Sequence, residues 1–533
     1  MRVTKAAEAA AMDRRANEAG TASWSLMEAA GRGAATVIRE RFRARLEGEV
    51  VVLAGGGNNG GDGYVVASEL AAAGARVTVV ATAPPGTDDS RRARAELPAA
   101  VRVQAWADGA SALQRASLVI DAMLGTGAAG APRAEVGEAI AAVARARGAG
   151  ASVAALDVPS GVNATTGEVP GGLLSPASDI AQDGSSAGVA PAASVTADIT
   201  VAFGTVKRGL LRNRDAAGEI VVVDIGLGAA AHDQTIPRLV DATYALSAVP
   251  PIAAGANKGT RRKLLIVGGA AGMAGAPILA ARGALRSGIG MVRVCVEPPS
   301  IVPVQAAEPS ALVVPWPVDD AALADYLGWT HAVLLGPGLG PGRAERELAA
   351  RVLSEWKGPV VVDADALNAF EGRAAELGRL LRGRPAVITP HPVEAQRLTG
   401  RSAGEIDAAR FDSAREIAKQ VNATVLLKGV PTVISDGAHT LIVASGTPVL
   451  ATGGSGDMLG GIVATLLAQT GDATASAAAG AWVHGRAAEL AGAGQVRGVT
   501  LDDVLASLRE AWRAPPQPRL PVLTELPCPG GAR

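Results

Sequence analysis

The sequence predicts an α/β protein with two domains, each built on a parallel sheet. Its 533 residues exceed the usual size of one hydrophobic core. Apolar runs of strand length alternate with helical stretches through both halves, and a glycine-rich turn follows the first such strand of each half. We expect one domain at residues 1–228, a linker with a leading strand at 229–254, a second domain at 255–513, and a disordered Pro/Gly-rich tail at 514–533.

The amino-acid composition argues against several classes of binding partner and cellular location. With 50 Lys and Arg against 51 Asp and Glu, and only 3% aromatic residues, the chain has little to offer a nucleic acid. Two cysteines, Cys295 and Cys528, exclude a disulfide framework and a zinc cluster. The charged N-terminus and the short apolar runs predict neither export nor a membrane span. We therefore expect a cytoplasmic protein that acts on small molecules, and a homo-oligomer is left open.

The N-terminal 47 residues have helical spacing and predict two packing helices. The next segment reads strand, glycine-rich turn, helix and strand, which is a βαβ unit of a Rossmann-like sheet. Gly55, Gly57 and Gly60 satisfy G-x-G-x-x-G, but no acidic residue ends the second strand to bind a ribose. We therefore expect this polar turn to gather oxygens around a cation or a substrate amide. The alternative is that Asn58 and Asn59 only supply left-handed turn conformations.

The next two predicted strands each end in an acid, Asp121 and Asp157, and a helix at residues 134–146 joins them. Ligands of open α/β sheets bind beyond the carboxyl ends of the strands. Two acids beside Asn59 at this edge would be unfavourable without a cation. Ser160 adds a further oxygen, so Asn59, Asp121 and Ser160 are candidate ligands of one monovalent cation. The alternative is that both acids are solvated loop carboxylates.

Residues 1–228 carry, in this order, AGGGNNGGDGYVVA, DAMLGTG, LDVPSGVNATTGEV, VAFGTVKRGLL and GEIVVVDIGLG. This run resembles the epimerase domain of the NAD(P)H-hydrate repair enzymes. The resemblance implies that Asn59, Asp121 and Ser160 hold potassium. It also implies that the hydrated nicotinamide nucleotide contacts Asn58, Asn59, Gly60, Gly61, Asp62, Gly125, Thr126, Gly127, Ala128, Ala129, Gly130, Ala131 and Asp157. The sequence departs from the family at Ala29, where the usual MENAG reads MEAAG, and in a Gly/Ser/Pro/Ala-rich insertion at 171–193 that predicts a disordered loop.

The second half repeats the α/β pattern, and its apolar runs end in Gly, Pro or polar clusters that should converge on one sheet edge. Its most informative stretch is ATGGSGDMLGG, residues 451–461, which precedes an apolar helical run. Free backbone N–H groups, the helix dipole and glycines together favour a bound phosphate. Asp457 is then either a helix cap or a base toward a hydroxyl that meets the phosphoryl group there. Both readings stay open at this point.

Residues 255–513 carry GPGLG, DADALN, TPHPVE, KGVPT and GGSGDMLGG in this order. They resemble the ADP-dependent NAD(P)H-hydrate dehydratases, relatives of the ribokinase-like kinases, which implies a ribokinase-like α/β fold. A departure is Asn257, which replaces the family's usual histidine. The resemblance places Ala276, Gly338, His391 and Asp457 at the hydrate, and Lys428, Gly429, Val430, Pro431, Thr432 and Gly456 at the adenine nucleotide.

Together the two resemblances imply a bifunctional repair enzyme with ADP as cosubstrate, potassium in the first domain, and magnesium on the nucleotide. Asp457 would take the proton of the hydrate hydroxyl as it attacks ADP. Asp157 is the candidate for acid–base work in epimerisation, by direct proton abstraction or by reversible loss of water. Two alternatives are a small-metabolite kinase with a regulatory nucleotide-binding N-terminal domain, and a first domain that only binds or scaffolds.

Overall fold

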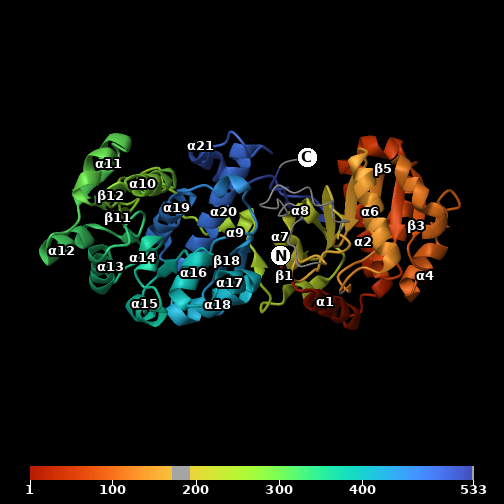
Figure 1. Ribbon diagram of the computed structural model, residues 1–533, viewed down its shortest axis with the longest axis horizontal. Coiled ribbons are helices and arrows are strands. Elements are labelled where there is room, and N and C mark those ends of the chain that lie inside the picture. The colour runs from red at the N-terminus through yellow and green to blue at the C-terminus, as the bar shows by residue number, and fades with distance from the viewer. Residues whose placement is uncertain (129, 171–192, 531–533) are drawn as a thin grey trace, which may run out of the picture. The chain divides into compact units, whose positions relative to one another are not determined.

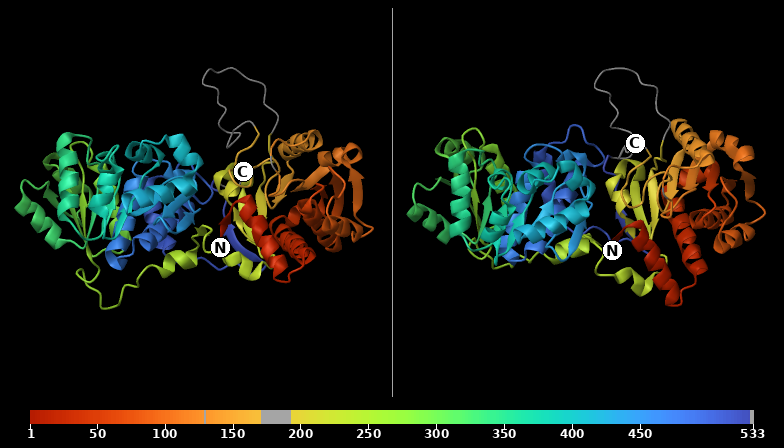
Figure 2. Two further views of the ribbon diagram at one scale, coloured as in Figure 1. Left: turned by 90° about the horizontal axis from the view of Figure 1, so that it is seen from below. Right: turned by 60° about the horizontal axis from the view of Figure 1, so that its bottom comes forward.

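The computed structural model describes residues 1–128, 130–170 and 193–530, which form two compact units (Figures 1 and 2). The first unit comprises Met1–Ile236 together with the C-terminal segment from Pro516, and the second comprises Pro237–Pro515. Ala129 and most of the predicted disordered insertion, residues 171–192, lie outside the described residues. The boundary between the units falls inside the predicted linker, residues 229–254.

The first unit contains an eight-stranded sheet in the order β20-β9-β7-β6-β5-β2-β3-β4. Every neighbouring pair is parallel except β20 with β9. The strands are β2 (Glu49–Ala54), β3 (Arg76–Ala81), β4 (Arg102–Ala105), β5 (Ala116–Ala122), β6 (Ser152–Leu156), β7 (Ile199–Phe203), β9 (Glu219–Val223) and β20 (Val522–Leu526). A separate two-stranded sheet pairs β1 (Val3–Thr4) with β8 (Val206–Lys207).

Helices cover both faces of this sheet because its strands are apolar on both sides. Alternate residues of β2 belong to different cores: Val50 and Val52 pack with α2 and α3, whereas Val51 and Leu53 pack with α6. The helices of this unit are α1 (Ala6–Glu18), α2 (Ser23–Arg41), α3 (Asn58–Ala72), α4 (Asp88–Ala95), α5 (Trp106–Gly109), α6 (Ala134–Gly148), α7 (Arg208–Arg212) and α8 (Arg214–Ala217). The predicted parallel-sheet fold is confirmed.

The predicted disorder of residues 514–533 is wrong for the segment that forms β20. This strand pairs antiparallel with β9 and completes the edge of the first unit's sheet. Arg41 bonds to Glu525 at 2.8 Å and to Glu219 of β9 at 3.0 Å, and Val522 packs against the core. Backbone pairing with a distant edge strand therefore supplies the order that the Pro/Gly-rich composition alone did not predict.

The second unit contains a ten-stranded sheet in the order β10-β19-β18-β17-β16-β15-β14-β11-β12-β13. It is parallel except where β18 pairs with β17 and with β19. The strands are β10 (Arg238–Leu239), β11 (Lys263–Val267), β12 (Met291–Val296), β13 (Leu312–Pro315), β14 (Ala332–Leu335), β15 (Val360–Val362), β16 (Ala386–Ile388), β17 (Thr424–Leu427), β18 (Thr432–Ser435) and β19 (Thr440–Val443). The leading strand predicted in the linker is β10.

The core of the second unit centres on α19 and α20, which are apolar on most sides and buried along most of their length. The helices are α9 (Ala242–Ser247), α10 (Gly275–Arg286), α11 (Ile301–Ala307), α12 (Asp320–Trp329), α13 (Arg343–Glu355), α14 (Asp365–Asn368), α15 (Ala374–Leu381), α16 (Pro392–Thr399), α17 (Ala403–Ala408), α18 (Arg410–Val421), α19 (Ser455–Thr470), α20 (Ala473–Gly492) and α21 (Leu501–Ala511).

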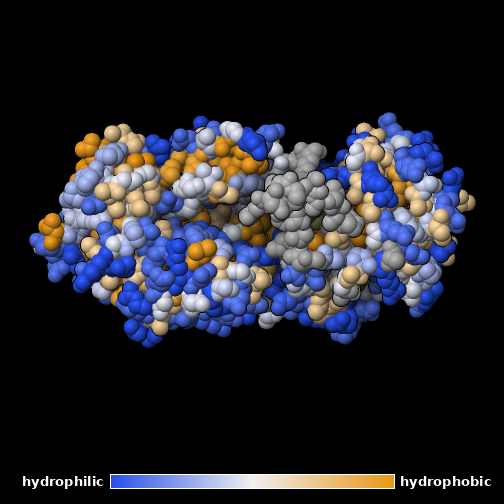
Figure 3. Space-filling model, in the orientation of Figure 1, coloured by the Kyte–Doolittle hydropathy of each residue, from blue (hydrophilic) through white to orange (hydrophobic). Residues whose placement is uncertain are grey.

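The surface in Figure 3 is largely hydrophilic, with apolar residues in separate patches. Among the described residues, no helix combines the length and the apolar character that crossing a membrane requires.

Candidate active sites

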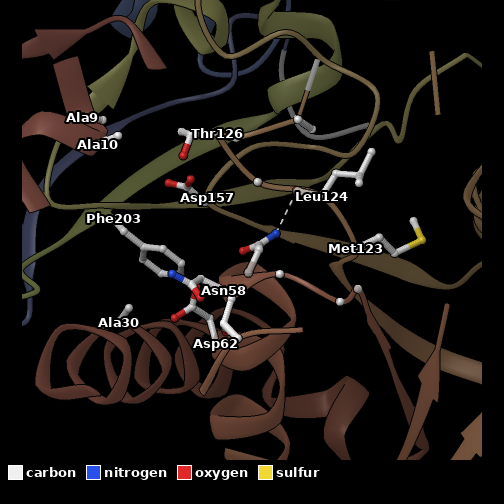
Figure 4. A pocket seen from close by; sticks show the side chains of 18 of the residues that line it. Ala9, Ala10, Ala30, Asn58, Asp62, Met123, Leu124, Thr126, Asp157 and Phe203 are labelled. Atoms are coloured by element: carbon white, nitrogen blue, oxygen red, sulfur yellow. Dashed lines mark hydrogen bonds between the residues drawn. The ribbon is translucent and has the colours of Figure 1, made fainter. Parts of the chain in front are cut away.

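The first unit has a cavity of about 1060 Å³ at the carboxyl edge of its sheet (Figure 4). Asn58, Asn59, Asp62 and Asp157 line it, as do the described residues of the predicted 125–131 loop. Gly60 and Gly61 belong to the packing instead. A Cβ on Gly60 would lie 1.9 Å from the carbonyl oxygen of Gly55, so only glycine fits there.

The polar turn after β2 is the start of α3. The helix begins at Asn58, with Gly57 as its N-cap, so part of the predicted turn is helical. Neither Asn58 nor Asn59 has a positive φ, so the alternative that they supply left-handed turn conformations is wrong. Their position in the first helical turn brings both side chains to the cavity.

Asn59, Asp121 and Ser160 come together behind this turn. Ser160 donates to Asp121 twice, from Oγ to Oδ1 at 2.6 Å and from its backbone N–H to Oδ2 at 2.7 Å. The Asn59 amide donates to the carbonyl of Leu124 at 2.8 Å, the dashed line in Figure 4, and the N–H of Leu124 donates to Ser160 Oγ at 3.0 Å. Burial raises the pKa of Asp121 to about 6, although the Ser160 hydrogen bonds oppose the rise.

This oxygen cluster fits a cation. The Oδ1 atom of Asn59 is buried and accepts no hydrogen bond from any described residue. The Nδ2 atom of the same side chain donates to two carbonyl oxygens, those of Leu124 and Leu156. Hard cations take carboxylate, amide and backbone carbonyl oxygens of this kind.

Asp157 follows β6 in a conformation that non-glycine residues rarely adopt, with φ at 63°. Its carboxylate forms an ion pair with Lys207, a residue that the sequence analysis did not select. Lys207 lies in β8, is 2% exposed, and also donates to the carbonyl of Phe203 at 2.8 Å. The adjacent basic residues Lys207 and Arg208, in the otherwise mostly apolar and glycine-containing stretch VAFGTVKRGLL, were the available signal.

A second carboxyl group faces the same cavity from α3. Figure 4 shows Asp62 reaching into the pocket from the helix, whereas Asp157 enters from the end of a strand. Burial raises the pKa of Asp62 well above its usual value, and the charges of Asp157 and of Asp13 in α1 raise it further. The site therefore pairs a carboxyl group whose burial favours the protonated form with a carboxylate bound to lysine, which suits acid–base chemistry.

The glycine-rich stretch of the second unit forms the N-terminus of α19. Gly454 is the N-cap with φ at 93°, and Asp457 lies in the first helical turn. No described backbone N–H donates to the Asp457 carboxylate, which argues against the helix-cap reading. Burial raises the pKa of Asp457 to about 7, and the charge of Asp363 adds to the rise while Lys428 opposes it. A carboxylate with this pKa is suited to act as a base at neutral pH.

Lys428 follows β17 and directs its ammonium group toward the start of α19. A Cβ on Gly456 would lie 3.3 Å from Lys428 Nζ. The ammonium binds Asp363 at 3.0 Å and lies 3.6 Å from Glu394. Burial lowers the pKa of Lys428, but the two carboxylates outweigh it and the pKa is raised. The N-terminus of α19 therefore lies beside a lysine whose pKa is raised, which favours its charged form.

His391 caps α16, because its Nδ1 accepts a hydrogen bond from the N–H of Val393 at 3.1 Å. Because Nδ1 is occupied by this capping bond, only the other edge of the half-exposed ring can contact a ligand. Ala276 of α10 and Gly338, after β14, are neighbours: a Cβ on Gly338 would lie 3.1 Å from that of Ala276.

The predicted nucleotide loop, residues 428–432, joins β17 to β18, and Val430 at its tip is 62% exposed. Asp363 of DADALN and Glu394 of TPHPVE also lie at this site, although neither is among the site residues predicted from the sequence. An acid directly after a buried strand was the signal for Asp363.

Each unit thus places a buried lysine–aspartate pair and a carboxyl group of raised pKa at the carboxyl edge of its parallel sheet. The fold and the two sites define a two-domain α/β enzyme for acid–base chemistry on small molecules, with a glycine-rich helix N-terminus at the site of the second domain.

Comparisons with known proteins agree with this class. Residues 264–509 match the family model described as NAD(P)H-hydrate dehydratase, and residues 23–209 match that of the YjeF-related protein N-terminus. The bifunctional NAD(P)H-hydrate repair enzyme Nnr of Thermanaerovibrio acidaminovorans is 34% identical over 92% of this chain and 94% of its own. That of Hyperthermus butylicus is 35% identical over 75% of this chain and 71% of its own. The chain belongs to the family of bifunctional NAD(P)H-hydrate repair enzymes.

Two solved structures resemble the second half. The ADP/ATP-dependent NAD(P)H-hydrate dehydratase from Bacillus subtilis, co-crystallised with ATP and Mg²⁺, is 26% identical and covers 52% of this chain and 98% of its own, with a TM-score of 0.46. A ribokinase-like superfamily protein from Enterococcus faecalis is 23% identical over 52% of this chain and 97% of its own, with a TM-score of 0.45.

Proposed function

We propose that the first unit interconverts the R and S forms of hydrated NADH and NADPH, and that the second dehydrates the S form at the expense of ADP. The products are NAD(P)H, AMP and phosphate. The observation that carries the second activity is Asp457, a half-buried carboxylate without a backbone hydrogen bond from the described residues, at a helix N-terminus beside the Lys428 ammonium.

The chemistry follows from the poor leaving ability of the ring hydroxyl. Asp457 takes the hydroxyl proton while the oxygen attacks the terminal phosphoryl group of ADP and AMP leaves. The ring nitrogen then donates its lone pair, the C–O bond breaks, and phosphate departs with the bonding electrons. Loss of a proton from the neighbouring ring carbon restores the reduced nicotinamide. The N–H of Ser455 donates to the carbonyl of Thr452 at 3.2 Å, whereas those of Gly454 and Gly456 donate to no described backbone carbonyl. These two N–H groups and the Lys428 ammonium stabilise the charge on the phosphoryl oxygens.

In the first unit, Asp157 and Asp62 are the acid–base pair for epimerisation. The raised pKa of Asp62 favours the protonated form, which can give its proton to the ring hydroxyl, and the Asp157 carboxylate can accept a proton. Such a pair assists reversible loss of water at the hydrated carbon, after which water returns to either face. Potassium held by Asn59, Asp121 and Ser160 would supply the counter-charge that the buried Asp121 lacks among its side-chain partners.

Magnesium would come largely with the nucleotide, because Mg²⁺ commonly binds substrate phosphates and keeps several waters. Among the described residues, no three acidic, histidine or cysteine side chains are arranged to hold a metal ion. A cytoplasmic location is also part of the proposal. It is supported by the two cysteines, which are both free, because cytosolic proteins rarely contain disulfides.

The deciding experiment is a product analysis. The protein is incubated with S hydrate and ADP, and we expect one AMP, one phosphate and one reduced nicotinamide for each hydrate consumed. A stable phosphorylated hydrate without reduced nicotinamide would instead indicate a kinase.

A further inference from the structure

Asp363 is a buried carboxylate next to the proposed base. It follows β15, is 1% exposed, and its backbone N–H donates to the carbonyl of Leu335 at 3.0 Å. A Cβ on Gly336 would lie 1.8 Å from its carbonyl oxygen, so the backbone here is closely packed. The position of this carboxylate is therefore fixed by the sheet.

The two oxygens of Asp363 face different groups. Oδ1 accepts a hydrogen bond from Lys428 Nζ at 3.0 Å. Oδ2 faces α19, because a Cβ on Gly460 would lie 3.4 Å from it. Gly460 lies three residues after Asp457 and so on the same side of the helix. Asp363 thus stands between the lysine and the helix that carries the base.

Glu394 cannot replace Asp363 in this role. It lies 3.6 Å from Lys428, but the same oxygen accepts a hydrogen bond from the backbone N–H of His391 at 2.8 Å. Glu394 is thereby committed to the N-terminal capping of α16. Asp363 gives Lys428 its closer and better-directed carboxylate.

The groups that act on Asp457 come from four elements or their ends. Asp363 follows β15, Lys428 follows β17, Asp365 begins α14 and Glu394 lies in α16. Only Lys428 among these is a cation, so it is the natural partner for Asp457 if it is not held elsewhere. An ion pair between them would neutralise the base and take the ammonium away from the phosphates.

We propose that Asp363 is a positioning residue of the dehydratase site: it holds the Lys428 ammonium at the N-terminus of α19, where it meets the nucleotide phosphates, and keeps it from pairing with Asp457. This inference rests on the proposed dehydratase function. It assigns to Asp363 no contact with the substrate.

The test is Asp363→Asn, which keeps the shape of the side chain and removes its charge. Lys428 is then free to pair with Asp457, and we expect dehydration to fall roughly 10- to 100-fold, as for a misplaced catalytic group. Losing a like charge and gaining a close cation both lower the pKa of Asp457. The acidic limb of the kcat–pH profile should therefore move to lower pH by about one unit or more.

Lys428→Gln should act in the opposite direction. Without the ammonium, the pKa of Asp457 rises, so the acidic limb should move to higher pH while ADP binds more weakly. The double variant should bring the limb back toward the wild-type position, because both charges are gone. If Asp363→Asn does not fold, the proposal is tested by the acidic limb and the ADP affinity of Lys428→Gln. An unchanged limb together with unchanged ADP binding in Lys428→Gln would overturn the proposal.

The exposed carboxylate Glu371 provides the control, and Glu371→Gln should leave rate and limb unchanged. A rate lost in Asp363→Asn without movement of the limb would indicate a merely structural role and overturn the inference, as would a wild-type rate and limb. Titration of the Asp457 carboxyl carbon by ¹³C NMR gives the same answer without turnover. If the wild-type protein does not dehydrate the hydrate at all, the proposed function fails, and the NMR titration alone then tests Asp363.

Discussion

Substitution of Asp457 tests whether its carboxylate acts as a general base or as a helix cap. Asp457→Asn keeps the size of the side chain and its ability to cap a helix but removes its basicity. We expect dehydration of S hydrate to fall by roughly 10²- to 10⁴-fold, the usual effect of losing a general base. ADP binding and epimerisation should persist, and both are measured on the same preparation. Near-normal dehydration by this variant would show that the carboxylate is not the base.

The raised pKa of Asp457 also predicts a pH dependence. The base must be ionised, so the dehydration rate should rise with pH through about 7 rather than near the ordinary value of 3.8. The pKa of this carboxyl group is higher in the folded state than in the unfolded state. Its ionisation therefore lowers the free energy of unfolding as pH rises from about 4 through 7. Asp457→Asn should therefore melt at a higher temperature than the wild type at pH 8, and the difference should vanish toward pH 4. A variant that melts lower at pH 8 would contradict the assigned burial.

The Asn59, Asp121 and Ser160 cluster predicts a potassium requirement for epimerisation. Replacing potassium by a bulky organic cation should lower both the epimerisation rate and the melting temperature of the first unit, because Asp121 then stays buried without a counter-charge. Asn59→Ala removes one oxygen ligand and should reduce the stabilisation by potassium, which a thermal-shift titration measures. Equal melting temperatures in both buffers would count against the site.

At the scale of elements, local sequence patterns predicted most of the fold, because alternating apolar runs and helical stretches are properties of short segments. They also predict which acids end strands, and this is sufficient to identify Asp121 and Asp157 from the sequence. The role of Lys207 was not predicted, because its ion pair with Asp157 depends on the small β1–β8 sheet. The two strands of that sheet lie about two hundred residues apart in the chain. The pairing of β20 with β9 is equally non-local.

The same pairing predicts the effect of truncation. Removing the residues after Pro515 exposes the edge of β9 and deletes the Arg41–Glu525 ion pair. We expect a loss of roughly 1–3 kcal/mol, which lowers the melting temperature of the first unit by about 2–10 °C. The second unit keeps all its strands and should melt unchanged. Glu525→Gln in the full chain, which keeps the strand, should cost much less, since exposed ion pairs contribute little.

At the scale of the whole molecule, each unit has its own sheet, its own lysine–aspartate pair and its own core, and the proposed function assigns one activity to each unit. The chain can then convert both hydrate epimers only when both sites work. The coupling is chemical, through the shared substrate, and needs no signal between the units.

The most direct measurement follows the near-ultraviolet absorbance of reduced nicotinamide when an equal mixture of R and S hydrates is given excess ADP. The wild-type chain should convert both epimers completely. Asp157→Asn should convert the S half at the wild-type rate and then continue only as fast as the R form epimerises spontaneously. Full conversion by Asp157→Asn at the wild-type rate, or no absorbance rise with the wild type, would contradict the assignment of the two activities to these two sites.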